Sequence, residues 1–373
     1  MKYTSYSYPS GKAEVATFTA DDGVTEYHLM IHATDPKQTY REQMNAVLDV
    51  YATVQKKELP GAAAVFKRYF LSDAANQAEL LLAATTDISD GALSVVEQPP
   101  LDGTKIALWV YLQTNVQTRA LSNGWYEVKH GACRQLWMGG SFNRAANAAC
   151  QMQLLLNDYV RQLVEQGCSL ADNCLRTWIF VQNVDSNYAG VVKARNDVFG
   201  TQNLTEKTHY IASTGIGGRH ADPKALVMLD ALAMEGLKPE QIKHLYARTH
   251  LNPTSEYGVS FERGTAVDYE GRRLVLISGT ASINNRGEIV HAGDVRQQTE
   301  RMWENVEMLL KEADCGFENM GHVIVYLRDI ADYTVVKEMF DQRFPEVPKI
   351  ITLAPVCRPG WLVEMECMAV RKL

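Results

Sequence analysis

Hydrophobic and polar residues follow two different periodicities along this chain. Residues 272–283 (RRLVLISGTASI) alternate and are rich in β-branched side chains, which predicts a strand. Residues 295–316 instead place apolar side chains three and four positions apart, which predicts an amphipathic helix with one buried face. That face comprises Val295, Thr299, Met302, Val306, Leu309 and Leu310. The last part of the chain is therefore expected to pack a long helix against a sheet.

The same order of elements occurs twice more upstream. Residues 133–142 (CRQLWMGGSF) match the strand at 274–283, and residues 175–234 and 322–370 both follow the order strand, turn, short helix, loop and closing strand. A fainter copy precedes them. The helix faces expected in these copies comprise Met44, Val47, Leu48, Tyr51 and Val54, then Met152, Leu155, Leu156, Tyr159, Leu163 and Val164. Repetition of this size predicts three related units, at 1–120, 121–240 and 241–373.

The predicted fold class is α+β. Each unit reads as a mixed sheet with two helices on one face, which leaves the other face of the sheet in need of a partner. Three such sheets in one chain can cover one another. We therefore expect a pseudo-trimeric barrel with the sheets inside and the helices outside, joined near residues 113–124 and 236–258.

Composition and charge narrow the function classes. The chain has 373 residues, a formal charge of −7 and no Lys/Arg-rich run, which argues against a nucleic-acid partner. The first residues lack an apolar signal core, and no stretch approaches the ~20 apolar residues of a spanning helix, so we expect a cytoplasmic protein without a membrane partner. Seven scattered cysteines without a CxxC pair indicate neither a disulfide framework nor a zinc site. We expect no metal and no organic cofactor.

Several segments of the third unit resemble a known family. Residues 278–344 and 362–370 are similar to the Rid (YjgF) superfamily, whose members are homotrimers with active sites between subunits. The chain thus resembles a fused pseudo-trimer, expected as a monomer or a weak oligomer. Closer similarity to the chorismatase branch, which cleaves the enolpyruvyl group from chorismate, rests on SFERGTAV (260–267), SGTASI (278–283), HAGDVRQQT (291–299) and VCRPGWLVEMEC (356–367).

Glu364 is the main candidate for catalysis. On an alternating strand it shares a face with Glu366, and the second unit has Met228 and Asp230 at these two positions. A carboxylate at position 364 is therefore not required by the fold. The resemblance places the family's catalytic carboxylate here, and partial burial would raise its pKa as a general acid requires. The alternative is an exposed glutamate on an edge strand.

Four further residues are candidates through the resemblance. In chorismatases that yield aromatic acids, a cysteine at the position of Cys357 approaches the substrate ring; a half-buried structural cysteine is the alternative. Arg358, Arg263 and Arg195 are candidate substrate-binding residues, because chorismate carries two carboxylates and arginine binds carboxylates bidentately. Each could equally be a surface arginine.

Lys349 is a weaker candidate for substrate binding. It lies fifteen residues before Glu364, where Rid deaminases carry the arginine that holds the substrate carboxylate. Lysine offers a point charge rather than a fork, which puts imine deamination in doubt. The GIGG segment at 215–218 lacks the strand-to-helix context of a dinucleotide site.

Other conspicuous residues are interpreted as structural. His28 and His32 share a strand face without a nearby third ligand. A set of tryptophans is expected to fill the barrel, namely Trp109, Trp125, Trp137 and Trp178.

The preferred functional hypothesis is a hydrolase or lyase that releases pyruvate from chorismate or a related enolpyruvyl ether. One alternative is a Rid-type deaminase that hydrolyses enamines or imines. A second alternative is a non-catalytic pseudo-trimer that binds a small metabolite. In each case the expected partner is a small molecule, a carboxylate substrate for the two enzymes.

Overall fold

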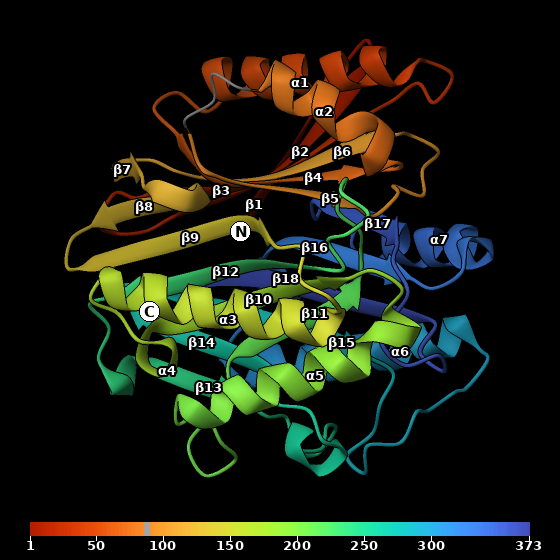
Figure 1. The fold of residues 1–373 in the computed structure, drawn as a ribbon. Helices are drawn as coiled ribbons and strands as arrows, with labels where there is room; N and C mark the ends of the chain where they lie inside the picture. Colours follow the sequence, from red (N-terminus) through yellow and green to blue (C-terminus); the bar gives the residue numbers. More distant parts are fainter. Residues whose placement is uncertain (86–89) are drawn as a thin grey trace.

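The structure, a computed structural model that describes residues 1–85 and 90–373, contains three units built on one plan (Figure 1). Each unit has a six-stranded mixed sheet, and the strand orders are equivalent: β1-β2-β3-β6-β4-β5, β7-β8-β9-β12-β10-β11 and β13-β14-β15-β18-β16-β17. In each sheet the last two strands of this order run parallel and are connected through a helix. The α+β fold with three repeated units is therefore confirmed.

The bounds of the elements follow the three units. The first unit comprises β1 (Lys2–Tyr8), β2 (Gly11–Thr19), β3 (Thr25–Ala33), α1 (Tyr40–Lys57), β4 (Ala63–Leu71), α2 (Ala74–Ala84), β5 (Ala92–Glu97) and β6 (Ile106–Gln113). The second unit comprises β7 (Gln117–Ala120), β8 (Trp125–His130), β9 (Cys133–Phe142), α3 (Ala148–Glu165), α4 (Leu170–Asn173), β10 (Cys174–Val181), α5 (Val184–Thr201), β11 (Ala212–Gly217) and β12 (Val227–Glu235). The third unit comprises β13 (Ile242–Leu245), β14 (Gly264–Tyr269), β15 (Arg272–Ala281), α6 (Val295–Glu312), β16 (Met320–Leu327), α7 (Tyr333–Arg343), β17 (Lys349–Leu353) and β18 (Val363–Lys372). Strand β7 ends at Ala120, within the range 1–120 predicted for the first unit, and pairs with β8 in the second sheet.

The long helices form for local reasons that the sequence contains. Helix α6 begins at Asp294, whose side chain accepts a hydrogen bond from the Gln297 backbone N–H at 3.0 Å. Helix α1 begins with a capping box between Thr39 and Glu42. The expected apolar faces are buried, except that Val164 is exposed and that Leu48 and Val295 are only half-buried. These helices cover the outer faces of their sheets (Figure 1).

The predicted closed barrel does not form. Within the described residues each sheet keeps its own edges, and neighbouring sheets are joined by isolated bridges instead of continuous ladders. Ala212 of β11 bridges to Glu262, and Thr352 of β17 bridges to Pro100. The three sheets therefore pack edge to face around a common axis, which leaves clefts between units.

Aromatic side chains fill the space between the inner faces of the sheets. Phe66 of the first unit lies 5.3 Å from Trp109 and 5.2 Å from Trp137, measured between ring centroids, and Trp178 packs beside them. Trp125 differs from the prediction, because it stacks on Tyr159 of α3 on the helix side of the second sheet. Three of the four tryptophans therefore occupy the centre. In the described part of the chain, no helix is both long and apolar enough to cross a membrane.

Candidate active site

Glu364 lies in a cleft between the second and third units. It stands near the start of β18, opposite Ala281 of β15 and Tyr326 of β16, and is only 5% exposed. The cleft contains a small cavity to which both units contribute. Its walls include Tyr188, Arg195, Ser213 and Gly215 from the second unit, and Val259, Phe261, Arg263, Gly279, Ala281, Ile283, Cys357, Arg358, Trp361 and Glu364 from the third.

A β-bulge in β15 makes room for the Glu364 carboxyl. The register of β15 against β18 shifts between Ile277 and Thr280, which inserts one extra residue beside the cavity. A Cβ atom on Gly279 would lie 2.2 Å from Oε1 of Glu364, so no larger residue fits there without displacing the carboxyl. Ser278 holds the bulge against the second unit, because its hydroxyl accepts from the Ser213 backbone N–H at 2.9 Å.

The surroundings of Glu364 favour its protonated form. Burial, and next the nearby charge of Glu366, raise the pKa of Glu364 from 4.5 to about 8, while Arg176 and Arg263 oppose the shift. Tyr326 faces it from β16, and Cys357, Arg195 and Arg358 share the cavity. A carboxyl with this pKa carries its proton at neutral pH and can donate it.

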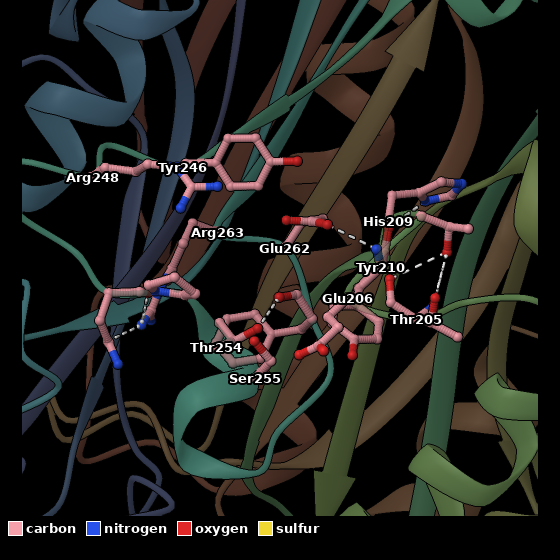
Figure 2. A pocket seen from close by; sticks show the side chains of 14 residues that line it. Thr205, Glu206, His209, Tyr210, Tyr246, Arg248, Thr254, Ser255, Glu262 and Arg263 are labelled. Carbon is pink, nitrogen blue, oxygen red and sulfur yellow. Dashed lines mark hydrogen bonds between the residues drawn. The ribbon is translucent and has the colours of Figure 1, made fainter.

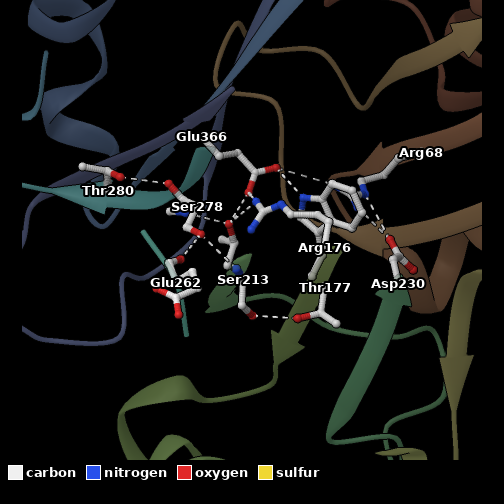
Figure 3. Close-up of polar contacts among 12 residues, drawn as sticks. Arg68, Arg176, Thr177, Ser213, Asp230, Glu262, Ser278, Thr280 and Glu366 are labelled. Atoms are coloured by element: carbon white, nitrogen blue, oxygen red, sulfur yellow. Dashed lines mark hydrogen bonds and ion pairs between the residues drawn. The ribbon is translucent and has the colours of Figure 1, made fainter. Parts of the chain in front are cut away.

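Glu366, two residues further along β18, is held differently (Figure 3). Its carboxylate accepts from Nη2 of Arg176 at 2.8 Å, from Nε1 of Trp178 at 2.7 Å and from the Thr214 hydroxyl. The Thr214 hydroxyl in turn accepts from the Gly279 backbone N–H at 2.9 Å. Charge-assisted hydrogen bonds of this kind stabilise an ionised carboxylate. The two glutamates on one strand face therefore have opposite environments.

A second buried ion pair continues this network across the first two units. Arg68 of β4 donates to Oδ2 of Asp230 from Nη2 at 2.8 Å and from Nε at 3.2 Å, and both residues are fully buried (Figure 3). Asp230 also accepts from the Gly140 backbone N–H at 2.6 Å. By strand register Asp230 occupies in the second sheet the position of Glu366 in the third. The network thus joins all three units at the centre of the molecule.

Arg195 lies in the cavity wall with unused donors. It projects from α5, is 1% exposed, and its Nε and Nη2 atoms have no hydrogen-bond partner among the described residues. These two atoms form the edge of the guanidinium that binds a carboxylate bidentately. A buried arginine without partners is costly, so this edge indicates an anionic ligand.

Arg263 and Arg358 also reach this cavity. Nη2 of Arg263 donates to the carbonyl oxygen and to Oδ1 of Asn252 at 3.1 and 3.0 Å, which fixes the guanidinium at the cavity wall. Arg358 lies over the ring of Trp361, with 4.9 Å between its Cζ atom and the ring centroid. Together with Arg195, these residues give the cavity three cations from two units.

Cys357 lies in the same cavity and was expected there. Burial, and next the charge of Glu364, raise the pKa of its thiol to about 12, so the thiol is neutral and is not an activated nucleophile. Tyr188 of α5, which the sequence analysis did not identify, makes a hydrogen bond that opposes this shift. A Cβ atom on Gly215 would lie 2.8 Å from the Tyr188 ring, so this glycine of the GIGG segment makes room for the tyrosine.

Lys349 does not line this cavity. Its Nζ atom donates to the Phe344 carbonyl at 3.0 Å and lies 3.4 Å from Asp341, and its backbone N–H donates to Glu14 of the first unit. The reason is the cyclic packing of the units, since β17 faces the first unit while Glu364 faces the second. By strand register Ser213 of β11 takes the place of Lys349 in the cavity.

The other two clefts lack the acid. The strand positions equivalent to Glu364 are occupied by Met228 in the second unit and Ala107 in the first. Between the first two units, a Cβ atom on Gly139 would lie 2.5 Å from the Leu93 carbonyl oxygen, so the backbones are in direct contact there. The acid and the cations thus meet between the second and third units.

The histidines interpreted as structural have packing partners. His28 stacks on Tyr111 with 4.6 Å between ring centroids, and its Nδ1 lies 3.1 Å from Nδ1 of His322. His32 lies 3.6 Å from Asp102 and 3.9 Å from Glu14.

One group of potential metal ligands occurs elsewhere in the described residues. Asp22, His130 and Glu270 bring ligand atoms within 4.8 Å of one another at the tips of three equivalent hairpins. Arg272 pairs with Asp22 at 3.0 Å and lies 3.7 Å from Glu270, so a guanidinium already balances these carboxylates.

Comparisons with known proteins agree with this architecture. A family described as Endoribonuclease L-PSP matches residues 265–371, within the third unit. A RutC family protein of Pyrococcus abyssi is 32% identical over 102 residues, which cover 26% of this chain and 80% of that protein. The 3-aminoacrylate deaminase RutC of Acinetobacter baylyi is 26% identical over 98 residues, which cover 26% of this chain and 78% of the enzyme. The crystal structure of a chorismatase shares the fold with a TM-score of 0.65 at 18% identity, over 82% of this chain and 93% of that chain.

Proposed function

Because this chain belongs to the Rid (YjgF) superfamily, we propose that it releases pyruvate from chorismate or a related enolpyruvyl ether. The observation that carries the proposal is the protonated acid Glu364 in a cavity shared with three arginines. An enol ether needs a proton donor at its methylene carbon, and a dianionic substrate needs more than one cation. The similarity to a chorismatase structure over most of the chain, which concerns the fold alone, is consistent with this proposal.

The chemistry follows from a single proton transfer. The Glu364 carboxyl donates its proton to the terminal methylene, and the double-bond electrons form the new C–H bond. The adjacent ether carbon becomes an oxocarbenium ion. In the hydrolytic route water adds to this carbon and gives its proton back to the Glu364 carboxylate. The resulting hemiketal breaks the bond between this carbon and the ring oxygen while its hydroxyl proton is transferred to that oxygen, which yields pyruvate and a ring alcohol.

A second route ends in a different ring product. Here the bond between the ring carbon and the ether oxygen breaks, and the oxygen leaves with pyruvate. The neighbouring ring carbon that carries the hydroxyl loses its proton to the Glu364 carboxylate, so chorismate divides into pyruvate and a hydroxybenzoate without consuming water. Cys357 lies beside Glu364 with a neutral thiol, where it displaces water from one side of the ring. We propose that Cys357 favours the aromatic product over hydrolysis.

The arginines position the substrate. The free Nε–Nη2 edge of Arg195 suits one carboxylate bidentately, and Arg263 or Arg358 suits the other. Holding both carboxylates fixes the methylene relative to Glu364, which is the geometric requirement for efficient proton transfer.

A second candidate function is hydrolysis of enamines or imines. It is favoured by the similarity to the 3-aminoacrylate deaminase RutC. Against it, Lys349 lies outside the cavity, and the cavity brings together three arginines from two units, more cations than a small monocarboxylate requires. A non-catalytic binding role would be supported by a filled, apolar cleft, whereas this cleft contains the Glu364 carboxyl and three arginines.

The test compares two substrates with the wild-type protein. Chorismate is assayed for pyruvate with lactate dehydrogenase and NADH, and 2-aminoacrylate, generated in situ, is assayed for ammonia. Pyruvate release from chorismate well above the spontaneous rate, with no acceleration of ammonia release, is the expected result. Ammonia release alone would replace the proposal with the deaminase, and no acceleration of either would refute both.

A further inference from the structure

A second cavity lies next to the reaction cavity, again between the second and third units (Figure 2). The second unit contributes Thr205, Glu206, Thr208, His209 and Tyr210 to its walls. The third unit contributes Tyr246, Arg248, Asn252, Pro253, Thr254, Ser255, Phe261, Glu262 and Arg263. Arg263 and Phe261 line both cavities and therefore form the wall between them.

Arg248 supplies a cation to this second cavity. Its guanidinium lies 4.9 Å from the centroid of the Tyr246 ring and forms no direct salt bridge with the described residues. Burial raises the pKa of Glu262, and Arg248 is among the charges that oppose this rise, so the two side chains interact within the cavity. The turn that carries it is held firmly. Oε2 of Glu312, in the last turn of α6, accepts from the Tyr246 and Ala247 backbone N–H groups at 3.1 and 2.6 Å. Ala247 takes a φ of 45°, an uncommon conformation for a residue with a side chain.

Glu262 supplies an acceptor on another wall of the same cavity. The residue is 6% exposed, and its Oε1 accepts from the Tyr210 backbone N–H at 2.8 Å. Its backbone is fixed as well, because its N–H donates to the Ile211 carbonyl at 3.0 Å. Hydroxyl groups of Thr205, Thr254 and Ser255 also line this space. The cavity thus combines the guanidinium of Arg248, which has no direct salt bridge among the described residues, with several groups that hydrogen-bond to hydroxyls.

The wall between the cavities is a compact loop. The Thr254 hydroxyl donates to the Phe261 carbonyl at 2.6 Å, and Arg263 binds both oxygens of Asn252, so residues 252–263 close on themselves. One side of this loop faces the reaction cavity through Phe261, and the other side faces the second cavity through Thr254. A ligand held by Arg248 would therefore lie against the same arginine that reaches the substrate.

We propose that the second cavity is a binding site for a hydroxylated organic acid, with its carboxylate on Arg248 and its hydroxyls on Glu262 and the neighbouring threonines. The ring acids that enter or leave the reaction cavity belong to this class, so this inference rests on the proposed function. A hydroxyl donates readily to a carboxylate, and arginine recognises the carboxylate. The cavity then holds the substrate before reaction or the ring product after it.

The first experiment counts sites by calorimetric titration of the full chain with shikimate, a trihydroxycyclohexene carboxylate. The wild type should bind two molecules. Arg248→Gln should weaken binding to the second cavity at least tenfold and leave binding to the reaction cavity unchanged. Arg195→Gln should weaken binding to the reaction cavity and leave binding to the second cavity unchanged. Arg296→Gln is the charge-matched control, since Arg296 is exposed in the first turn of α6 and lines neither cavity. A single site, or unchanged binding in Arg248→Gln, would overturn the proposal.

Two further arms define the ligand class and its source. In the wild type the second site should prefer shikimate to cyclohexene carboxylate, and Glu262→Gln should abolish that preference; a preference that survives would contradict the role of Glu262. If the site holds incoming substrate, Arg248→Gln raises KM for chorismate; if it holds product, the variant weakens inhibition by the ring product. Binding at two sites without pyruvate release would refute the proposed function but support the second binding site. Pyruvate release with binding at one site would support the proposed function but refute the second binding site.

Discussion

Replacing Glu366 by glutamine should lower the pKa of Glu364 without changing the shape of the side chain at position 366. The two side chains share a face of β18, and the carboxylate of Glu366 accepts hydrogen bonds from Arg176, Trp178 and Thr214. Its charge opposes ionisation of Glu364, second in importance to burial. Glutamine keeps the shape and an accepting oxygen but removes the charge.

The magnitude follows from the strand geometry. Residues two apart on a strand are separated by about 7 Å, from a rise of about 3.3 Å per residue. Two unit charges at that distance interact by about 2 kcal/mol at an effective dielectric constant of ~20, which corresponds to roughly 1.5 pKa units. The unpaired charge of Arg176 would add to the decrease. The pKa of Glu364, about 8 in the wild type, should therefore fall by at least one unit.

The assay is a ¹³C NMR titration of glutamate-labelled protein, with Glu364→Gln used to assign the resonance. Asp230→Asn is the matched control. Asp230 occupies the equivalent strand position in the second unit and pairs with Arg68, and its carboxyl also faces the Gly140 backbone N–H. The control should destabilise the fold, because it leaves Arg68 buried without its partner, yet leave the Glu364 titration in place. An unshifted titration in Glu366→Gln, or an equal shift in both variants, would refute the reasoning.

The remaining predictions concern the same cavity. Because folding raises the pKa of Glu364 from 4.5 to about 8, the stability of the folded protein falls as pH rises through that window. Glu364→Gln should therefore be more stable than wild type by about 3 kcal/mol at pH 7 and by little at pH 4. Denaturant unfolding at both pH values checks this, and equal stability of the two proteins at pH 7 would count against it. The same pKa predicts that kcat/KM for pyruvate release falls above about pH 8, and a profile that instead rises there would contradict Glu364 as the acid. Gly279→Ala should displace the Glu364 carboxyl, since the new Cβ atom would lie 2.2 Å from its Oε1 atom. The variant should lose turnover and keep a native circular dichroism spectrum. Undiminished turnover would show that the position of the carboxyl is unimportant. Arg195→Gln should lower kcat/KM by roughly 10- to 100-fold, as expected for a lost charged hydrogen bond of about 1.5–3 kcal/mol, and an unaffected kcat/KM would remove Arg195 from the binding site.

Much of the fold could be predicted from periodicity and repetition. The helix faces and the alternating strands follow from local spacing, and the equivalence of Glu364 with Met228 follows from aligning the repeats, which the strand registers reproduce. What could not be predicted is how the units meet. A barrel requires continuous hydrogen bonding between sheets, and whether edge strands pair or pack against a face depends on contacts far apart in sequence.

The same dependence on contacts between units explains which residues of the site could not be predicted. Lys349 was a candidate because it lies fifteen residues before Glu364, where Rid deaminases carry an arginine, whereas the cavity takes its far wall from the neighbouring unit, through Ser213 and Arg195. Tyr188 gave no signal of its own, although the two glycines on one face of β11 indicated that something bulky approaches that strand closely. Glu364 and the arginines of the third unit were identifiable because their segments carry the family resemblance.

The central claim is that Glu364 donates the proton that releases pyruvate. The most direct measurement is the rate of pyruvate release from chorismate by wild type and Glu364→Gln, at equal folded concentration and pH 7. General acid catalysis contributes about 10²- to 10⁴-fold, so the account predicts a loss of that order with binding of shikimate retained. Turnover by Glu364→Gln within a few-fold of wild type would contradict it.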